Sequence, residues 1–194
     1  MKKNLMIAVL MTIATTVLLG IIYPLVVTGL AQVLFPRQAN GQLKEQNGKV
    51  VGSLIIGQAF TGAGYFHPRP SAVNYDATNS NGSQFGPTNQ KLIDRVKGDV
   101  AAAQAENPGQ PVPVDLVTAS GSGLDPDISP AAAAFQIPRI TKERGIKDGE
   151  LQQLVAKHTE GRQFGFLGEP RVNVLQLNLE LDERYPLKKQ AKAR

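Results

Sequence analysis

The sequence predicts a mixed α/β soluble domain that is tethered to a membrane by one N-terminal transmembrane helix. Residues 4–36 contain no charged side chain. In the rest of the 194-residue chain, short apolar runs that suit strands alternate with capped helical patterns, which is typical of a mixed domain with one core. We therefore divide the chain into a short N-terminus with its membrane helix (1–36), one domain (37–187) and a basic tail (188–194).

The uncharged run is long enough to cross a bilayer. Residues 5–34 exceed the ~20 apolar residues that span a ~30 Å hydrocarbon core. Pro24 is expected to kink this helix or to end its regular part, because proline lacks a backbone N–H. A cleaved signal peptide is the alternative, with Lys2 and Lys3 as its basic head. Since the apolar part of a signal peptide is usually only about 7–15 residues long, we prefer an uncleaved anchor.

One face of the predicted membrane helix carries small or polar residues at four-residue spacing: Ala8, Thr12, Thr16 and Gly20. Such a row lets the backbone of another helix approach closely, so it favours transmembrane helix packing, although Ala and Thr are also common in membrane helices that pack against lipid alone. Lys2 and Lys3 favour an N-terminus in the cytoplasm by the positive-inside bias, and we expect the domain to be exported.

The soluble part yields a series of expected elements. We predict a linker or hairpin at 40–49, strands at 50–56 and 112–116, and helices at 88–105, 130–137, 141–144 and 148–161. The caps are Thr88, Ser129 and Asp148, and Pro138 is expected to close the second of these helices. Residues 172–182 fit a strand through alternating leucines and a helix capped by Asn173 equally well, and periodicity does not decide between them.

A long segment at 58–89 is rich in Gly, Pro, Asn and Ser but is interrupted by Phe and Tyr. Structureless loops of this length are uncommon in compact domains unless they are functional. The aromatic residues indicate a loop that is pinned to the core or to a partner.

The charge distribution argues against nucleic-acid binding. The net charge is +5, but six basic residues lie at the two ends of the chain, and the remaining 15 nearly balance the 16 acidic residues. A protein that neutralises phosphates concentrates Lys and Arg on its folded domain.

The residue types for catalysis are scarce. The chain has no Cys and only two His, so a zinc site with three or four ligands is improbable, and a Ser-His-Asp triad would have to use His67. No G-x-S-x-G elbow is present. The Gly48-Lys49 pair lacks the other residues of a phosphate-binding loop. We expect no catalytic residue, no metal and no cofactor of the chain's own.

Two loop motifs have both a binding and a structural interpretation. Ser120 and Ser122 lie in a Ser-Gly-Ser-Gly turn whose backbone N–H groups suit an anion, but a tight turn is the preferred interpretation. Asp125 and Asp127 suit a cation, but carboxylates in loops more often accept hydrogen bonds in turns or caps.

Three long motifs, at 57–72, 117–140 and 172–182, follow the anchor in order. In sequence and spacing they resemble the C subunit of the bacterial Kdp potassium-transporting ATPase, and the resemblance runs from the anchor to Asp182. It implies a four-subunit complex, in which a channel-like A subunit selects potassium, a P-type B subunit hydrolyses ATP and a small F peptide stabilises the assembly.

The resemblance further implies a single-pass inner-membrane protein whose domain is extracytoplasmic (periplasmic) and which is needed for assembly and activity. The family is also described as a catalytic chaperone that raises the ATP affinity of the B subunit. Because an extracytoplasmic domain cannot touch cytoplasmic ATP, we favour a structural role near the outer opening of the channel. ATP then acts through the B subunit, and potassium is the transported ion.

The positions that match the family motifs are the candidate contacts to partners or ligands: Gln58, Phe60, Tyr65, His67, Arg69, Ser71, Ser120, Asp125, Gln136 and Arg139. Ser122 joins them through its turn. Phe60 and Tyr65 suit core or loop-pinning roles, whereas His67 and Arg69 suit bonds to loop backbone or to a partner. The alternative functions are a membrane-anchored periplasmic binding or sensor module outside such a complex, and a tethered periplasmic enzyme.

Overall fold

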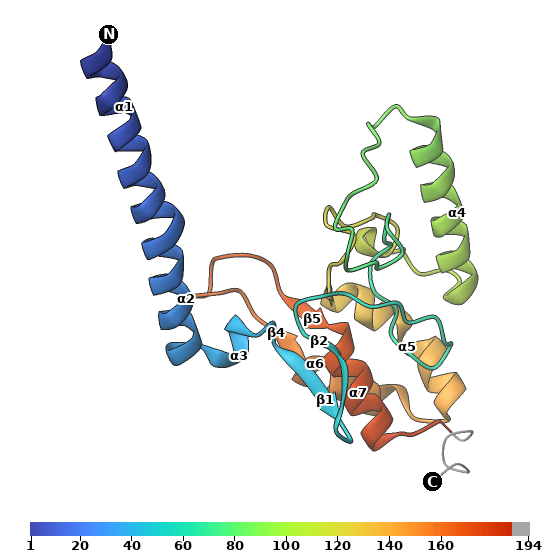
Figure 1. The fold of residues 1–194 in the computed structure, drawn as a ribbon. Coiled ribbons are helices and arrows are strands. Elements are labelled where there is room, and N and C mark those ends of the chain that lie inside the picture. Colours follow the sequence, from blue (N-terminus) through green and yellow to red (C-terminus); the bar gives the residue numbers. More distant parts are fainter. Residues whose placement is uncertain (188–194) are drawn as a thin grey trace. The chain divides into compact units, whose positions relative to one another are not determined.

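The computed structural model describes residues 1–187, so the predicted basic tail at 188–194 lies outside the described residues. The chain folds as two units, one covering Met1–Val51 and one that begins at Gly52. Helices and short strands occur together (Figure 1), which confirms the mixed α/β class.

A continuous helix, Lys2–Leu34, opens the first unit and is 33 residues long. It consists of α1 (Lys2–Thr15), the π-helical segment η1 (Thr16–Ile22) and α2 (Tyr23–Leu34). Within residues 1–187 it is the one helix that is long and apolar enough to span a membrane. The disturbance expected at Pro24 is the π-helical segment just before it: regular α-helical bonding stops there, but the helix continues.

A short helix and most of a hairpin complete the first unit. Helix α3 (Pro36–Ala39) leads into β1 (Leu43–Gln46), which pairs with β2 (Lys49–Ser53). The two turn residues Asn47 and Gly48 have φ of +53° and +72°, as a tight two-residue hairpin turn requires. The predicted hairpin is confirmed, and the strand predicted after it ends earlier than expected, at Ser53.

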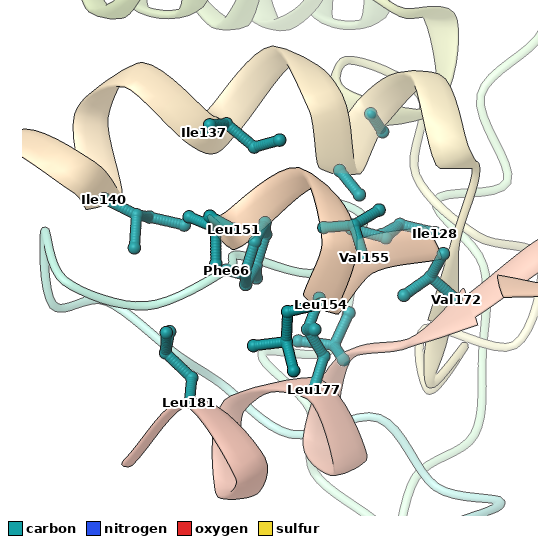
Figure 2. Packing of buried hydrophobic residues seen from close by; sticks show 13 residues of the cluster. Phe66, Ile128, Ile137, Ile140, Leu151, Leu154, Val155, Val172, Leu177 and Leu181 are labelled. Carbon is teal, nitrogen blue, oxygen red and sulfur yellow. The ribbon is translucent and has the colours of Figure 1, made fainter. Parts of the chain in front are cut away.

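The domain is built around three helices: α5 (Pro130–Arg144), α6 (Asp148–Lys157) and α7 (Val174–Arg184). Helix α6 packs on both α5 and α7. Figure 2 shows their apolar side chains converging around Phe66, which comes from the long segment at 58–89. The buried cluster is Phe66, Ile128, Ala132, Ala133, Ile137, Ile140, Leu151, Leu154, Val155, Val172, Val174, Leu177 and Leu181.

A small antiparallel sheet runs into this core. Its strand order is β3 (Asp127–Ile128), β5 (Arg171–Asn173), β4 (Thr159–Glu160). The buried Val172 of the central strand lies opposite Ile128 on one side and Thr159 on the other. The ambiguous segment at 172–182 therefore contains the end of a strand followed by a helix, with Asn173 as the N-cap that accepts a hydrogen bond from the Gln176 N–H (3.1 Å).

The predicted end of helix α5 is wrong. Pro138 does not close it: the helix runs on to Arg144, where Gly145 ends it with φ of +70°. The residue four positions earlier, Ala134, is exposed like Pro138 itself. The carbonyl that loses its partner therefore faces water, so the proline is tolerated, and Thr141 continues this helix instead of starting another.

The strand predicted at 112–116 is also wrong. Val114–Leu116 forms a single 3₁₀ turn, η2, and Val114 is exposed. Pro113 removes an N–H donor from the middle of this segment, and Pro111 directly precedes it.

Helix α4 spans Gln90–Glu106. Its N-cap is Asn89, which accepts a hydrogen bond from the Lys91 N–H (2.9 Å), rather than Thr88. Likewise α6 is preceded by Lys147 as N-cap, with Asp148 as its first residue, and it ends at Lys157 instead of near Gly161.

Candidate functional site

Two side-chain amides hold the long loop at 58–89 against the helices. Asn178 of α7 is buried and bonds the backbone of Phe66 twice, accepting from its N–H and donating to its carbonyl (2.9 Å each). Gln136 of α5, also buried, does the same to His67, with bonds of 2.7 and 3.1 Å. The backbone of this part of the loop is therefore paired with amide side chains from two helices instead of with neighbouring strands. This pairing satisfies buried backbone groups that would otherwise be costly.

Two arginines of α5 form hydrogen bonds with the turn that precedes Phe66. Arg144, whose side chain is 0% exposed, donates from Nε to the Gly64 carbonyl (2.6 Å) and from Nη2 to Asp182 (2.8 Å). Its guanidinium lies 4.8 Å from the centre of the Tyr65 ring, and the Tyr65 hydroxyl donates to the same aspartate (3.0 Å). A cation stacked on an aromatic ring and bonded to backbone holds the turn in one conformation.

Arg139 is the second arginine that bonds this turn. Its Nη1 donates to the carbonyls of Ala63 (2.6 Å) and Tyr65 (3.0 Å), and its Nη2 donates to Gln136 (2.8 Å). Its Nε pairs with Glu106 of α4 (2.9 Å). Arg139 thus links the loop to two helices.

His67 lies beside a small cleft. The cleft has a volume of about 220 Å³, and its lining includes His67, Asp99, Glu106, Leu116 and Phe135. This is smaller than the ~300–1,000 Å³ of typical ligand pockets. Burial, and then the charge of Arg139, hold the pKa of His67 below its ordinary value of 6.5. The neutral ring places Nε2 3.1 Å from the Gly62 carbonyl, where it acts as a hydrogen-bond donor within the loop.

The next stretch of the loop is joined to the Ser-Gly-Ser-Gly turn. Arg69 pairs with Asp125 (2.9 Å), and both side chains are 28% exposed. Tyr75 donates its hydroxyl to the Arg69 carbonyl (2.5 Å), and burial raises the pKa of Tyr75 to about 12. Ser71 Oγ donates to the Gly123 carbonyl (2.6 Å) and accepts from two loop N–H groups.

Two of the turn's backbone donors bond within the protein. The N–H of Ser120 bonds the Pro70 carbonyl (3.2 Å), and that of Gly123 bonds the Ser120 carbonyl (3.3 Å). Ser122 accepts from the Leu124 N–H (3.1 Å). Gly123 has φ of +69°, and a Cβ there would lie 2.7 Å from the Asn81 carbonyl oxygen, so glycine is required for this approach. This geometry favours the turn interpretation over an anion site.

Both carboxylates of the proposed cation motif have protein partners. Asp125 pairs with Arg69, whereas Asp127 accepts from Asn173 (3.0 Å) and lies 3.3 Å from Arg171 Nε. Burial raises the pKa of Asp127. A guanidinium at each carboxylate leaves little net negative charge for a cation.

The remaining sequence-predicted residues divide between core and loop. Phe60 is half-buried against the core, with its ring 5.9 Å from that of Tyr65. Gln58 is half-buried, and its amide lies against Gly52. In the first unit, Thr12 donates its hydroxyl to the Ala8 carbonyl (2.9 Å). The row of small residues is exposed along the helix, and its packing role stays a prediction.

Sequence reasoning missed Asn178 and Arg144. Each is a polar residue on an otherwise buried helical face: Asn178 lies four positions after Val174, and Arg144 lies four after Ile140. A polar side chain within an apolar helical stripe was the signal that could have identified them.

Comparison with known proteins adds the family. A family model described as "K+-transporting ATPase, c chain" matches residues 5–183. The chain is 62% identical over 189 residues to the "Potassium-transporting ATPase KdpC subunit" of Koribacter versatilis (strain Ellin345), covering 96% of this chain and 98% of that protein. Similarly named proteins of Methylobacterium nodulans (55% over 197 residues; 94% and 98%) and Rhodospirillum rubrum (56% over 191 residues; 96% and 99%) are also similar.

Proposed function

Because the chain belongs to the family of KdpC subunits of the potassium-transporting ATPase, we propose that it is a non-catalytic accessory subunit that assembles with a channel-like A subunit, a P-type B subunit and a small F peptide. Residues 1–187 contain one helix that is long and apolar enough to cross a membrane. In this proposal the domain is extracytoplasmic and stabilises the active complex by contact with its partners.

The observation that supports a non-catalytic role is that the polar side chains of the family motifs form hydrogen bonds within the domain itself. Gln136, Arg139 and Arg69 bond backbone or side chains of the domain itself. His67 bonds a loop carbonyl, and His158, the other histidine, lies 2.6 Å from Glu180. Such groups hold a loop in place, whereas a general base would be directed at a nucleophile. The domain is thereby supported as a rigid body for docking.

The His158 cluster supports the same interpretation. Lys157 donates to Glu180 (2.6 Å), and the hydrogen bonds from Lys157 and then His158 lower the pKa of this carboxylate. Arg184 also pairs with it (2.6 Å). The cluster ties the end of α6 to α7, which is a structural task.

For the energy source and the transported ion, we propose that this chain binds neither ATP nor a cofactor of its own. ATP is hydrolysed by the B subunit, and potassium passes through the A subunit. The cleft at His67 is smaller than typical ligand pockets, which argues against ATP binding at that position. An effect on ATP affinity is then exerted through contacts between subunits.

The test is purification of the complex from cells with an affinity tag on the A subunit. We expect this chain to be retained in mild detergent, and the potassium-stimulated ATPase activity to be lost when it is deleted. The purified chain alone should hydrolyse no ATP. A free-standing binding or sensor module would instead purify without these partners and leave ATPase activity unchanged after deletion.

Orientation has its own test. Lys2 and Lys3 before the anchor support an N-terminus in the cytoplasm. Protease added to intact spheroplasts should then remove the domain, whereas a domain protected until the cells are lysed would contradict an extracytoplasmic location.

A further inference from the structure

A second loop of the domain has the opposite character to the candidate site. Residues 161–170 join β4 to β5, and the middle of this segment, residues 163–168, exposes large apolar side chains: Phe164 is 87% exposed, Phe166 70% and Leu167 47%. We call residues 163–168 the apolar tip. It contains no charged residue, and exposed apolar side chains that cluster in this way mark an interaction site.

The apolar tip is held by its own backbone. Gln163 and Leu167 form a bridge in which each N–H bonds the carbonyl of the other (2.9 Å both). The N–H groups of Gly165 and Phe166 bond the carbonyls of Arg162 (3.1 Å) and Gln163 (3.2 Å). Four of the six N–H groups of the tip are therefore paired internally, which lowers the penalty of unsatisfied donors when the turn leaves water.

Charged residues lie only at the base of the segment, and they pair with each other. Arg162 bonds both carboxylate oxygens of Glu169 (2.8 and 2.7 Å). Arg171 pairs with Glu160 (3.0 Å) and Asp127 (3.3 Å). The base therefore offers no unbalanced positive charge for anionic headgroups, and an interaction of the tip has to be apolar.

Chain connectivity keeps the domain near a bilayer. The helix ends at Leu34, and the second unit begins at Gly52. The connecting residues 35–51 would reach about 60 Å if fully extended, but they contain a helical turn and most of a hairpin that doubles back. A tethered group meets the lipid surface at a high effective concentration, so even a small apolar contact is populated.

We propose that the apolar tip inserts into the surface of the bilayer that holds the chain's own anchor, as a second membrane contact. Phe164, Phe166 and Leu167 enter the boundary between headgroups and acyl chains, and the paired arginines stay at headgroup level. The contact needs no anionic lipid and is insensitive to salt. It rests on the anchor and not on the proposed partners, because the bilayer is present whether or not the other subunits bind.

The test uses the absence of Trp from the chain. Phe166→Trp in the full-length protein introduces a single emitter, and Val114→Trp on η2 is the matched control, because Val114 is also 70% exposed. Each variant is placed without partners in phosphatidylcholine nanodiscs, with or without brominated acyl chains. We expect emission from Phe166→Trp at shorter wavelength than from Val114→Trp, strong quenching by bromine, and no change with added salt.

Water-like, unquenched emission from Phe166→Trp would overturn the proposal. So would a blue shift that arises only when the other subunits are added, since this outcome identifies a protein pocket instead of lipid. Phe164→Trp provides a second reporter if the first variant folds poorly. A chain that fails to co-purify with A and B subunits but passes this test would refute the proposed function and leave the lipid contact standing.

Discussion

The two long loops of the domain contain the same kinds of residue and use them in opposite ways. The segment at 58–89 and the segment at 161–170 are both rich in Gly and aromatic side chains. In the first, Phe66 is 0% exposed and lies at the centre of the core (Figure 2). In the second, Phe164 is 87% exposed. The difference is what surrounds each backbone.

The first loop is buried because the helices supply hydrogen-bond partners for its peptide groups. Asn178 bonds the backbone of Phe66, and Gln136 bonds that of His67. Among the described residues, no helix side chain bonds the backbone of the second loop in this way. That loop instead bonds to itself through its Gln163–Leu167 bridge. An aromatic residue in a loop is therefore a core residue only where neighbouring elements can pair its backbone.

The largest effect is expected from Phe66→Ala. This substitution removes a fully buried ring at the meeting point of α5, α6 and α7, and we expect the free energy of unfolding to fall by about 4 kcal/mol. Urea unfolding of the full-length chain in detergent, followed by circular dichroism, measures it. Phe66→Leu keeps most of the volume and should lose much less. Equal losses for the two variants would mean that the first loop is not part of the core.

Asn178→Ala tests the backbone pairing itself. The change leaves the N–H and carbonyl of Phe66 buried without partners, so we expect a loss of about 3 kcal/mol in the free energy of unfolding. Glu183→Ala, at an exposed position of the same helix, is the control and should change stability by less than about 0.5 kcal/mol. If both variants behaved alike, the contrast between the two loops would not depend on hydrogen bonding.

A smaller effect is expected from pH at His67. Its pKa is lowered in the folded protein, mainly by burial, so the unfolded chain binds this proton first as the pH falls. Stability from this group is present above the unfolded value of about 6.5 and declines as the pH drops below it. Unfolding titrations from pH 8 to 5.5 should show a steeper decline for the native chain than for His67→Gln. Parallel curves would show that the ring is solvated.

Much of the fold could be predicted from local signals. The uncharged run predicted the long apolar helix, the hairpin was one of two alternatives at 40–49, Ser129 was correctly identified as a cap, and Asn173 as a cap was one of two alternatives for 172–182. The error in the length of helix α5 arose because the environment of the helix decided the outcome. Pro138 is tolerated because the carbonyl it orphans faces water.

The candidate site was less accessible to sequence reasoning. Gln136 and Arg139 were identified from family motifs, and the structure brings them to the loop at His67. Their acceptors are backbone carbonyls, which carry no sequence signal. Asn178 bonds a residue 112 positions away, and such pairing depends on how helices pack. Likewise, no pattern in the sequence distinguishes the buried Phe66 from the exposed Phe164.

The smallest change in folding stability is expected at the apolar tip. Replacing Phe164 and Phe166 together by Ser removes two exposed rings that make no side-chain hydrogen bond, so the free energy of unfolding in detergent should change by less than about 0.5 kcal/mol. Two aromatic side chains in the second loop would then matter far less for folding than Phe66 alone in the first. A loss as large as that of Phe66→Ala would show that the tip is packed in the folded state and would remove the distinction between the two loops.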